Sequence, residues 1–142
     1  MLTLLASEAR TASGTYSVPE ALARSIAKAS RSLFLLEVTA AATAAGDTLN
    51  VFVQSSVDGT VWDDFIHFTE VLGDGGAKKF LAAWNGVITP TTALGPPADG
   101  TLSAGVKQGP VGSQFRVKWV IVDATTDDAS FTFGLKAQPS AN

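Results

Sequence analysis

Seven aspartates lie in or beside predicted turns, and a pair of carboxylates is what a glycosidase uses for general acid and base catalysis. They are Asp58, Asp63, Asp64, Asp74, Asp123, Asp127 and Asp128. The geometry of a tight turn accounts for Asp58, and solvated charge is ordinary at the predicted hairpin tip of Asp127 and Asp128. Asp63 and Asp64 are neighbours on a predicted strand, so they point to opposite sides and cannot act together. We therefore predict no catalytic residue, and calcium bound at a loop stays an alternative.

His67 is the only histidine, and the chain has no cysteine. A transition-metal site needs several histidine or cysteine ligands, so we predict no metal ligand and no cofactor. A Ser-His-Asp site needs a serine on a strained turn, and the sequence lacks the G-x-S-x-G pattern of such turns. His67 is therefore expected on a semi-exposed strand face. The lack of cysteine also excludes disulfides and fits folding in a reducing cytosol.

The three tryptophans could stack on the ring of a bound sugar. Trp62 and Trp119 fall on the apolar phase of their predicted strands, which favours packing in the core for both. Trp84 is followed by Asn85-Gly86, a turn-like pair, so it is the tryptophan that we would choose for ligand contact. A glycan-binding surface therefore stays an alternative to a purely structural role.

The elements that must position these residues are strands. Residues 49–54 carry the period-two pattern of a strand with one face toward a core. Asp58 and Gly59 then predict a tight type I′ hairpin turn, because both central residues of that turn need positive φ. The chain returns as a second strand over residues 61–68. Its predicted inner face comprises Trp62, Asp64, Ile66 and Phe68, with Phe65 on the opposite face.

Other segments complete an all-β pattern. Further strands are predicted over residues 33–39, 80–88, 115–122 and 130–137, with a short strand in 102–106 and a helix over 19–31. We expect 33–39 to be buried on both faces, and the helix competes with an irregular edge segment. Six or so strands at short spacing predict an antiparallel β-sandwich or jelly-roll in one domain, residues 19–142.

Two segments are candidates for contact with other chains. Residues 1–18 form either two edge strands around Ser13-Gly14 or an extended N-terminal arm on a neighbouring subunit. Residues 89–112 form a long Pro/Gly-rich loop, and such loops are usually functional or disordered. The candidate interface residues are Leu2, Leu4, Tyr16, Trp84, Pro90, Pro96, Pro97 and Pro110.

Composition narrows the choice of partner. The 142 residues, 46% of them hydrophobic, can bury one core without the support of disulfides or metal ions. A net charge of −3 argues against a nucleic-acid partner, and no run reaches the roughly 18 apolar residues of a membrane span. Residues 2–6 are too short for a signal peptide and lack basic residues. Only 16% of residues are charged, which suggests a surface covered by other chains or a compact alanine-rich domain.

Three segments carry recognisable motifs: L-x-V-T-A-A in residues 36–46, L-x-V-x-V-Q-x-S-x-D-G-x-x-W in 49–62, and the last two predicted strands in 112–137. In this order they resemble a pattern of small virion proteins from tailed bacteriophages. The resemblance covers residues 33–69 and 112–137, about half of the chain. Asp58, Gly59, Trp62 and Trp119 are the fold-defining residues within it, and 72–111 has no counterpart.

The resemblance implies a non-enzymatic structural protein of a phage particle. Its place would be the capsid surface, as a decoration or cement protein made in the host cytoplasm. Its partners would be the major capsid protein and further copies of itself, with a trimer favoured. The arm and the long loop would supply many weak contacts that add in avidity. A neck or tail component and a carbohydrate-binding adsorption module are the alternatives.

Overall fold

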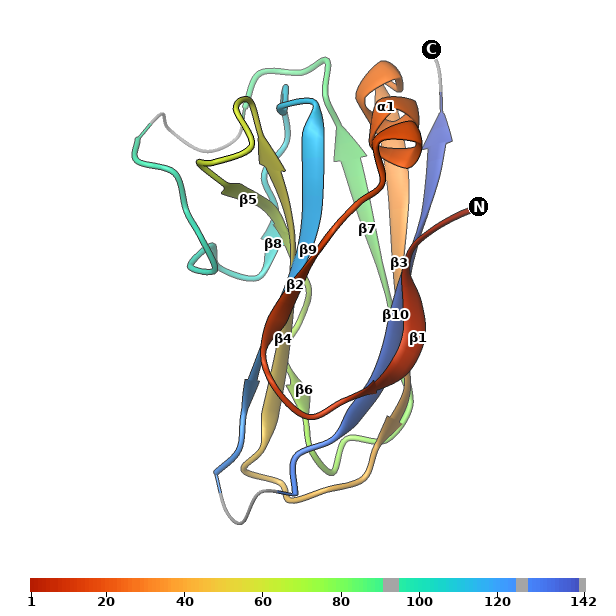
Figure 1. Ribbon diagram of the computed structural model, residues 1–142, viewed down its shortest axis with the longest axis vertical. Helices are drawn as coiled ribbons and strands as arrows, with labels where there is room; N and C mark the ends of the chain where they lie inside the picture. The colour runs from red at the N-terminus through yellow and green to blue at the C-terminus, as the bar shows by residue number, and fades with distance from the viewer. Residues whose placement is uncertain (91–94, 125–127, 141–142) are drawn as a thin grey trace.

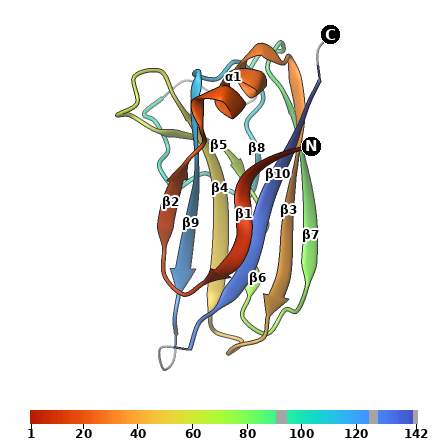
Figure 2. The ribbon, with the colours of Figure 1, turned by 45° about the vertical axis from the view of Figure 1, so that its right-hand side comes forward.

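The computed structural model describes residues 1–90, 95–124 and 128–140. Two antiparallel sheets pack face to face in this part of the chain, and the core lies between them (Figures 1 and 2). The predicted all-β antiparallel sandwich is confirmed. No helix among the described residues is both long and apolar enough to cross a bilayer.

The two sheets are named A and B here. Sheet A has the strand order β1 (Leu2–Arg10), β10 (Phe131–Ser140), β3 (Arg31–Ala41) and β7 (Lys78–Asn85). Sheet B has the order β2 (Gly14–Ser17), β9 (Gln114–Val122), β4 (Thr48–Ser56), β5 (Asp63–His67) and β8 (Gly105–Val106), and β6 (Val71–Leu72) pairs with β4. One helix, α1 (Glu20–Lys28), follows β2.

Residues 1–18 are edge strands of the sandwich. β1 pairs with β10 and β2 pairs with β9, so this segment crosses from sheet A to sheet B (Figure 1). Of the two alternatives, the structure shows the edge strands. Leu4 is 1% exposed and cannot be an interface residue, because it packs in the core. Leu2 is half-buried against that core, whereas Tyr16 is exposed.

The buried side chain of Arg10 ties the N-terminal segment to both sheets. Its guanidinium donates hydrogen bonds to the carbonyl oxygens of Phe133, at 2.7 Å, and Ala6, at 2.9 Å. It also lies 4.7 Å from the ring centre of Phe133, in sheet A, and 5.0 Å from that of Trp119, in sheet B. Trp119 packs half-buried against the core, in keeping with its apolar phase.

The predicted helix is present and buries Ala23 and Ile26. Pro19 precedes it with φ −53°, a value that suits a helix start. The expectation that 33–39 is buried on both faces is wrong, since burial alternates along β3. Phe34 faces the core, whereas Leu33 is 45% exposed because none of the described segments covers the outer face of sheet A at this position.

The hairpin between β4 and β5 is present, but its turn differs from the prediction. Residues 57–62 join the two strands, so the connection is longer than a two-residue type I′ turn. Gly59 has the expected positive φ of 78°. The Asp58 carboxylate accepts the N–H groups of Thr60, at 2.8 Å, and Val61, at 2.9 Å. The side chain of Asp58 thus shapes the turn from within.

The predicted face of Phe65 is wrong because β5 contains a bulge. Val53 pairs with Ile66 and Gln54 with Asp64, which leaves Phe65 as the extra residue. One inserted residue shifts the period-two pattern, so Phe65 and Ile66 both enter the core. Phe65 makes edge contacts with three rings, at centre distances of 5.8 to 5.9 Å. They belong to Phe34, Trp84 and Phe115.

Candidate functional site

Asp64 binds the middle of the long loop on the outer face of sheet B. The side chain is fully buried, and its oxygens accept three successive backbone N–H groups of the loop. The donors are Gly100, Thr101 and Leu102, at 2.8, 2.9 and 3.1 Å. Gln54 Nε2 adds a fourth hydrogen bond at 2.7 Å. A carboxylate used in this way supports the loop and has little capacity left to act on a substrate.

Asp63 holds the same loop on either side of this contact. Its Oδ1 accepts the N–H of Ala98 at 2.9 Å, and its Oδ2 forms an ion pair with Lys107. Asp63 and Asp64 are predicted to point to opposite sides of their strand. In the structure the long loop contacts both carboxylates, Asp64 through successive backbone N–H groups and Asp63 through Ala98 and Lys107.

Asp99 connects the loop to two cations of β9. It accepts hydrogen bonds from Lys118 Nζ and Gln54 Nε2, at 2.8 and 2.7 Å, and lies 3.3 Å from Arg116. The hydrogen bond from Lys118, followed by that from Gln54, lowers the pKa of Asp99 below its usual value. Contacts with the sandwich of the same chain therefore hold the described part of the loop in place.

The far end of the loop is held against β7. Gln108 donates to the carbonyl of Ala83 at 2.8 Å and accepts the N–H of Asn85 at 2.6 Å. Trp84 is only 4% exposed, and its indole N–H donates to the carbonyl of Gly109 at 3.0 Å. Trp84 is thus a core residue, which corrects its choice as a ligand-stacking or interface residue. Among the other candidates, Pro90, Pro96, Pro97 and Pro110 are exposed.

Trp62 was predicted to pack in the core, and the structure contradicts this prediction. It lies outside the core and is half-buried. The Arg116 guanidinium lies over its ring, 4.5 Å from the centre. The apolar phase assigned to Trp62 fails because it belongs to the connection 57–62 and not to β5.

His67 lies half-buried on β5, as expected from its strand position. Its ring stacks on Phe52 at a centre distance of 4.1 Å. Nδ1 is 2.7 Å from the Leu102 carbonyl and Nε2 is 2.7 Å from Asn50 Oδ1. Both ring nitrogens therefore contact groups of the same chain, which leaves His67 a structural role beside the loop.

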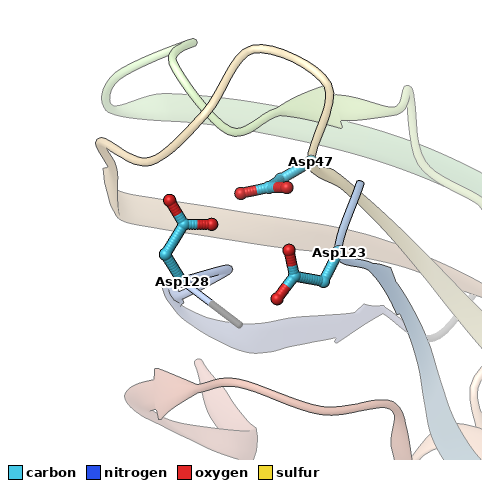
Figure 3. A group of neighbouring side chains, drawn as sticks. All are labelled: Asp47, Asp123 and Asp128. Atoms are coloured by element: carbon cyan, nitrogen blue, oxygen red, sulfur yellow. The ribbon is translucent and has the colours of Figure 1, made fainter. Parts of the chain in front are cut away.

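Three carboxylates meet at the opposite end of the sandwich from α1. Asp47, Asp123 and Asp128 point toward one another, with oxygens within 4.8 Å of each other (Figure 3). Burial acts to raise the pKa of Asp47, but hydrogen bonds from the N–H groups of Ala124 and Ala44 outweigh it and lower that pKa. Calcium takes six to eight oxygen ligands, so three carboxylates do not define a site for it. The predicted tip residue Asp127 lies outside the described residues.

The outer face of sheet A carries exposed apolar side chains. Leu33 pairs with Ala83 and Leu35 with Leu81 across β3 and β7. Leu81 is 69% exposed, and Leu33, Ala83 and Ile88 line a common hollow. We call these five residues the sheet A patch. The apolar run 33–36 is the sequence feature that points to the sheet A patch, although we interpreted that run as a strand buried on both faces.

Comparison with protein families, with curated proteins and with solved structures finds no match for this chain. A functional assignment therefore depends on the residues and surfaces described above.

Proposed function

We propose that this chain is a non-enzymatic structural protein of a tailed-phage particle, most simply a decoration protein on the head. The observation that carries the proposal is the sheet A patch. Contiguous exposed leucines on an otherwise closed sandwich mark a contact surface, because their burial by another chain is favourable. The resemblance of 33–69 and 112–137 to phage virion proteins supplies the kind of assembly.

The carboxylates are consistent with a structural role. Asp58, Asp63 and Asp64 each accept backbone N–H groups of their own chain. Their oxygens therefore stabilise a turn and a loop. These carboxylates, which were candidates for acid or base chemistry, are therefore engaged in hydrogen bonds within the described part of the chain.

We assign contacts between copies of the chain to the sheet A patch and not to strand addition at β7. Lys78 and Lys79 begin this edge strand, and lysines on an edge oppose pairing with another strand. Gln108 occupies backbone groups at its other end. The exposed prolines of the long loop are then the proposed contacts with the coat protein. The neighbouring residues Ala98 and Gly109 are already held by hydrogen bonds, so binding at Pro97 and Pro110 orders little new chain.

The test is to mix the purified chain with phage heads that lack it and to count bound copies by quantitative mass spectrometry. A high copy number, in a fixed ratio to the coat protein, supports decoration. Imaging of a labelled copy then separates even head coverage from a single position at the neck or along the tail. Absence from heads, neck and tail overturns the proposal.

A variant pair tests the assigned surface. Leu33→Ser with Leu81→Ser should convert an oligomer into a monomer in analytical ultracentrifugation, because both side chains lose their apolar contacts. Val57→Ser is the matched control, since Val57 is 85% exposed but lies outside the patch. An oligomer that survives the double change with unaltered affinity contradicts the assignment.

A further inference from the structure

A cavity of about 570 Å³ opens between α1 and the connection 57–62, at the end of the sandwich that carries the helix. Its lining is mixed: apolar residues such as Val18, Ala23 and Phe115 lie beside polar ones. The residues that matter here are Trp62, Gln114, Ser17, Ser113, Glu20 and Arg24. Its size lies within the range of roughly 300–1,000 Å³ that is common for small-molecule sites.

Trp62 lies at the wall of this cavity, with its ring packed against a cation. Arg116 lies over the indole at 4.5 Å from the ring centre. Arg116 is itself fixed, because its Nε donates to Gln54 Oε1 at 2.5 Å and a terminal nitrogen lies 3.3 Å from Asp99. The indole therefore offers a flat apolar surface whose position is set before any ligand binds, which lowers the entropic cost of binding.

The polar groups of the cavity favour an uncharged ligand. Glu20 and Arg24 form an ion pair with each other, so their charges largely cancel. The amide of Gln114 and the hydroxyls of Ser17 and Ser113 can each donate and accept hydrogen bonds. A ligand with many hydroxyl groups has the same dual capacity. An anion would need an unpaired cation, and a purely apolar ligand would leave these groups without partners.

We propose that this cavity binds carbohydrate, with a neutral sugar ring stacked on Trp62 and its hydroxyls bonded to Gln114 and the two serines. The C–H face of a pyranose is apolar and its rim is polar, which matches a fixed indole surrounded by amide and hydroxyl groups. This function is separate from the role in the particle, because the cavity shares no residue with the sheet A patch.

The experiment uses the full chain and a panel of neutral tri- to hexasaccharides of gluco, galacto and manno configuration, with acidic oligosaccharides that contain uronic acids as a comparison set. Binding is detected by saturation-transfer NMR and quantified by titration calorimetry. We expect binding of at least one member, an affinity lowered at least tenfold by Trp62→Ala, and a smaller loss in Trp62→Phe. Leu72→Ser, on β6 and outside both the cavity and the sheet A patch, should bind like the unchanged chain.

Gln114→Ala provides a second test if Trp62→Ala fails to fold, because Gln114 is exposed. It should lower the affinity severalfold while the melting temperature stays within a few degrees. Three results overturn the proposal: no binding by any panel member at millimolar concentration, binding that both cavity variants leave unchanged, or binding of acidic sugars only. None of these results affects the number of copies on a particle, so the two proposals can fail separately.

Discussion

At the scale of single residues, Asp64 is the side chain on which the long loop depends most. Asp64→Asn replaces one acceptor oxygen by an N–H₂ group that faces backbone N–H donors. We expect the free energy of unfolding to fall by about 2–4 kcal/mol, the range for a buried hydrogen-bond network that loses a charged acceptor. Urea unfolding followed by circular dichroism measures it.

The control for this change is Asp74→Asn, because Asp74 is exposed in a loop. It should stay within about 0.5 kcal/mol of the unchanged chain. If Asp64→Asn is equally mild, the carboxylate does not hold the loop in solution.

Three other aspartates predict how stability depends on pH. Hydrogen bonds lower the pKa of Asp58, chiefly from the Val61 and Thr60 N–H groups, and the pKa values of Asp47 and Asp99 are lowered as described above. In the unfolded chain such groups titrate near 3.9, so below that pH the unfolded state binds more protons than the folded state. Stability should therefore be full above about pH 5 and fall as the pH drops through 4 toward the folded-state pKa values.

The measurement is the urea midpoint at a series of pH values from about 2 to 7. Asp58→Asn keeps an oxygen that can accept both N–H groups but removes the titration. Its midpoint should decline less steeply in acid. A midpoint that stays constant down to pH 2.5 would show that these pKa values are not lowered.

At the scale of elements, the strands could be predicted and their irregularities could not. The alternation of Phe115, Val117 and Trp119 predicts the inner face of β9, and these residues do face the core. The bulge at Phe65 carries no local signal, because one inserted residue leaves the composition of β5 unchanged. The helix α1 was open to two interpretations, since only Leu22 and Ile26 with Ala29 suggested its apolar side.

The long loop could be located in the sequence, but its conformation could not be predicted. The Pro/Gly-rich composition of residues 89–112 predicts where the loop begins and ends and which prolines it exposes. Its attachment depends on backbone N–H groups, which have no side-chain signature, and on Asp64, which lies 36 residues before Gly100. Bonds between such distant positions follow from the packed sheet and not from any local pattern.

A pair of glycines tests whether the loop has the conformation described. Gly100 has φ +80°, and a Cβ there would lie 3.2 Å from Lys118, whereas a Cβ at Gly95 would meet nothing within 4 Å. Gly100→Ala should therefore cost about 1–2 kcal/mol and speed proteolysis within residues 95–107. Gly95→Ala should change neither quantity appreciably. Equal behaviour of the two variants would contradict the left-handed conformation at Gly100.

At the scale of the whole molecule, the N-terminal segment makes the two sheets one cooperative unit. β1 belongs to sheet A and β2 to sheet B, and the guanidinium of Arg10 contacts both Phe133 and Trp119. The edge strands β1 and β2 are consecutive in the chain, so unfolding of one sheet disturbs the edge strand of the other. The tryptophans report on both layers, since Trp84 lies in sheet A and Trp119 in sheet B.

Arg10→Ala tests this cooperativity, because it removes three hydrogen bonds to carbonyl groups, those of Phe133, Ala6 and Glu8, and both ring contacts. We expect the free energy of unfolding to fall by about 2–4 kcal/mol, with tryptophan fluorescence and circular dichroism still giving one coincident transition. Arg24→Ala is the control and should cost under about 1 kcal/mol, because the ion pair of Arg24 with Glu20 on α1 is exposed. Two separate transitions in the Arg10 variant would mean that the crossing of the chain from β1 to β2 is not enough, without Arg10, to make the two sheets one cooperative unit.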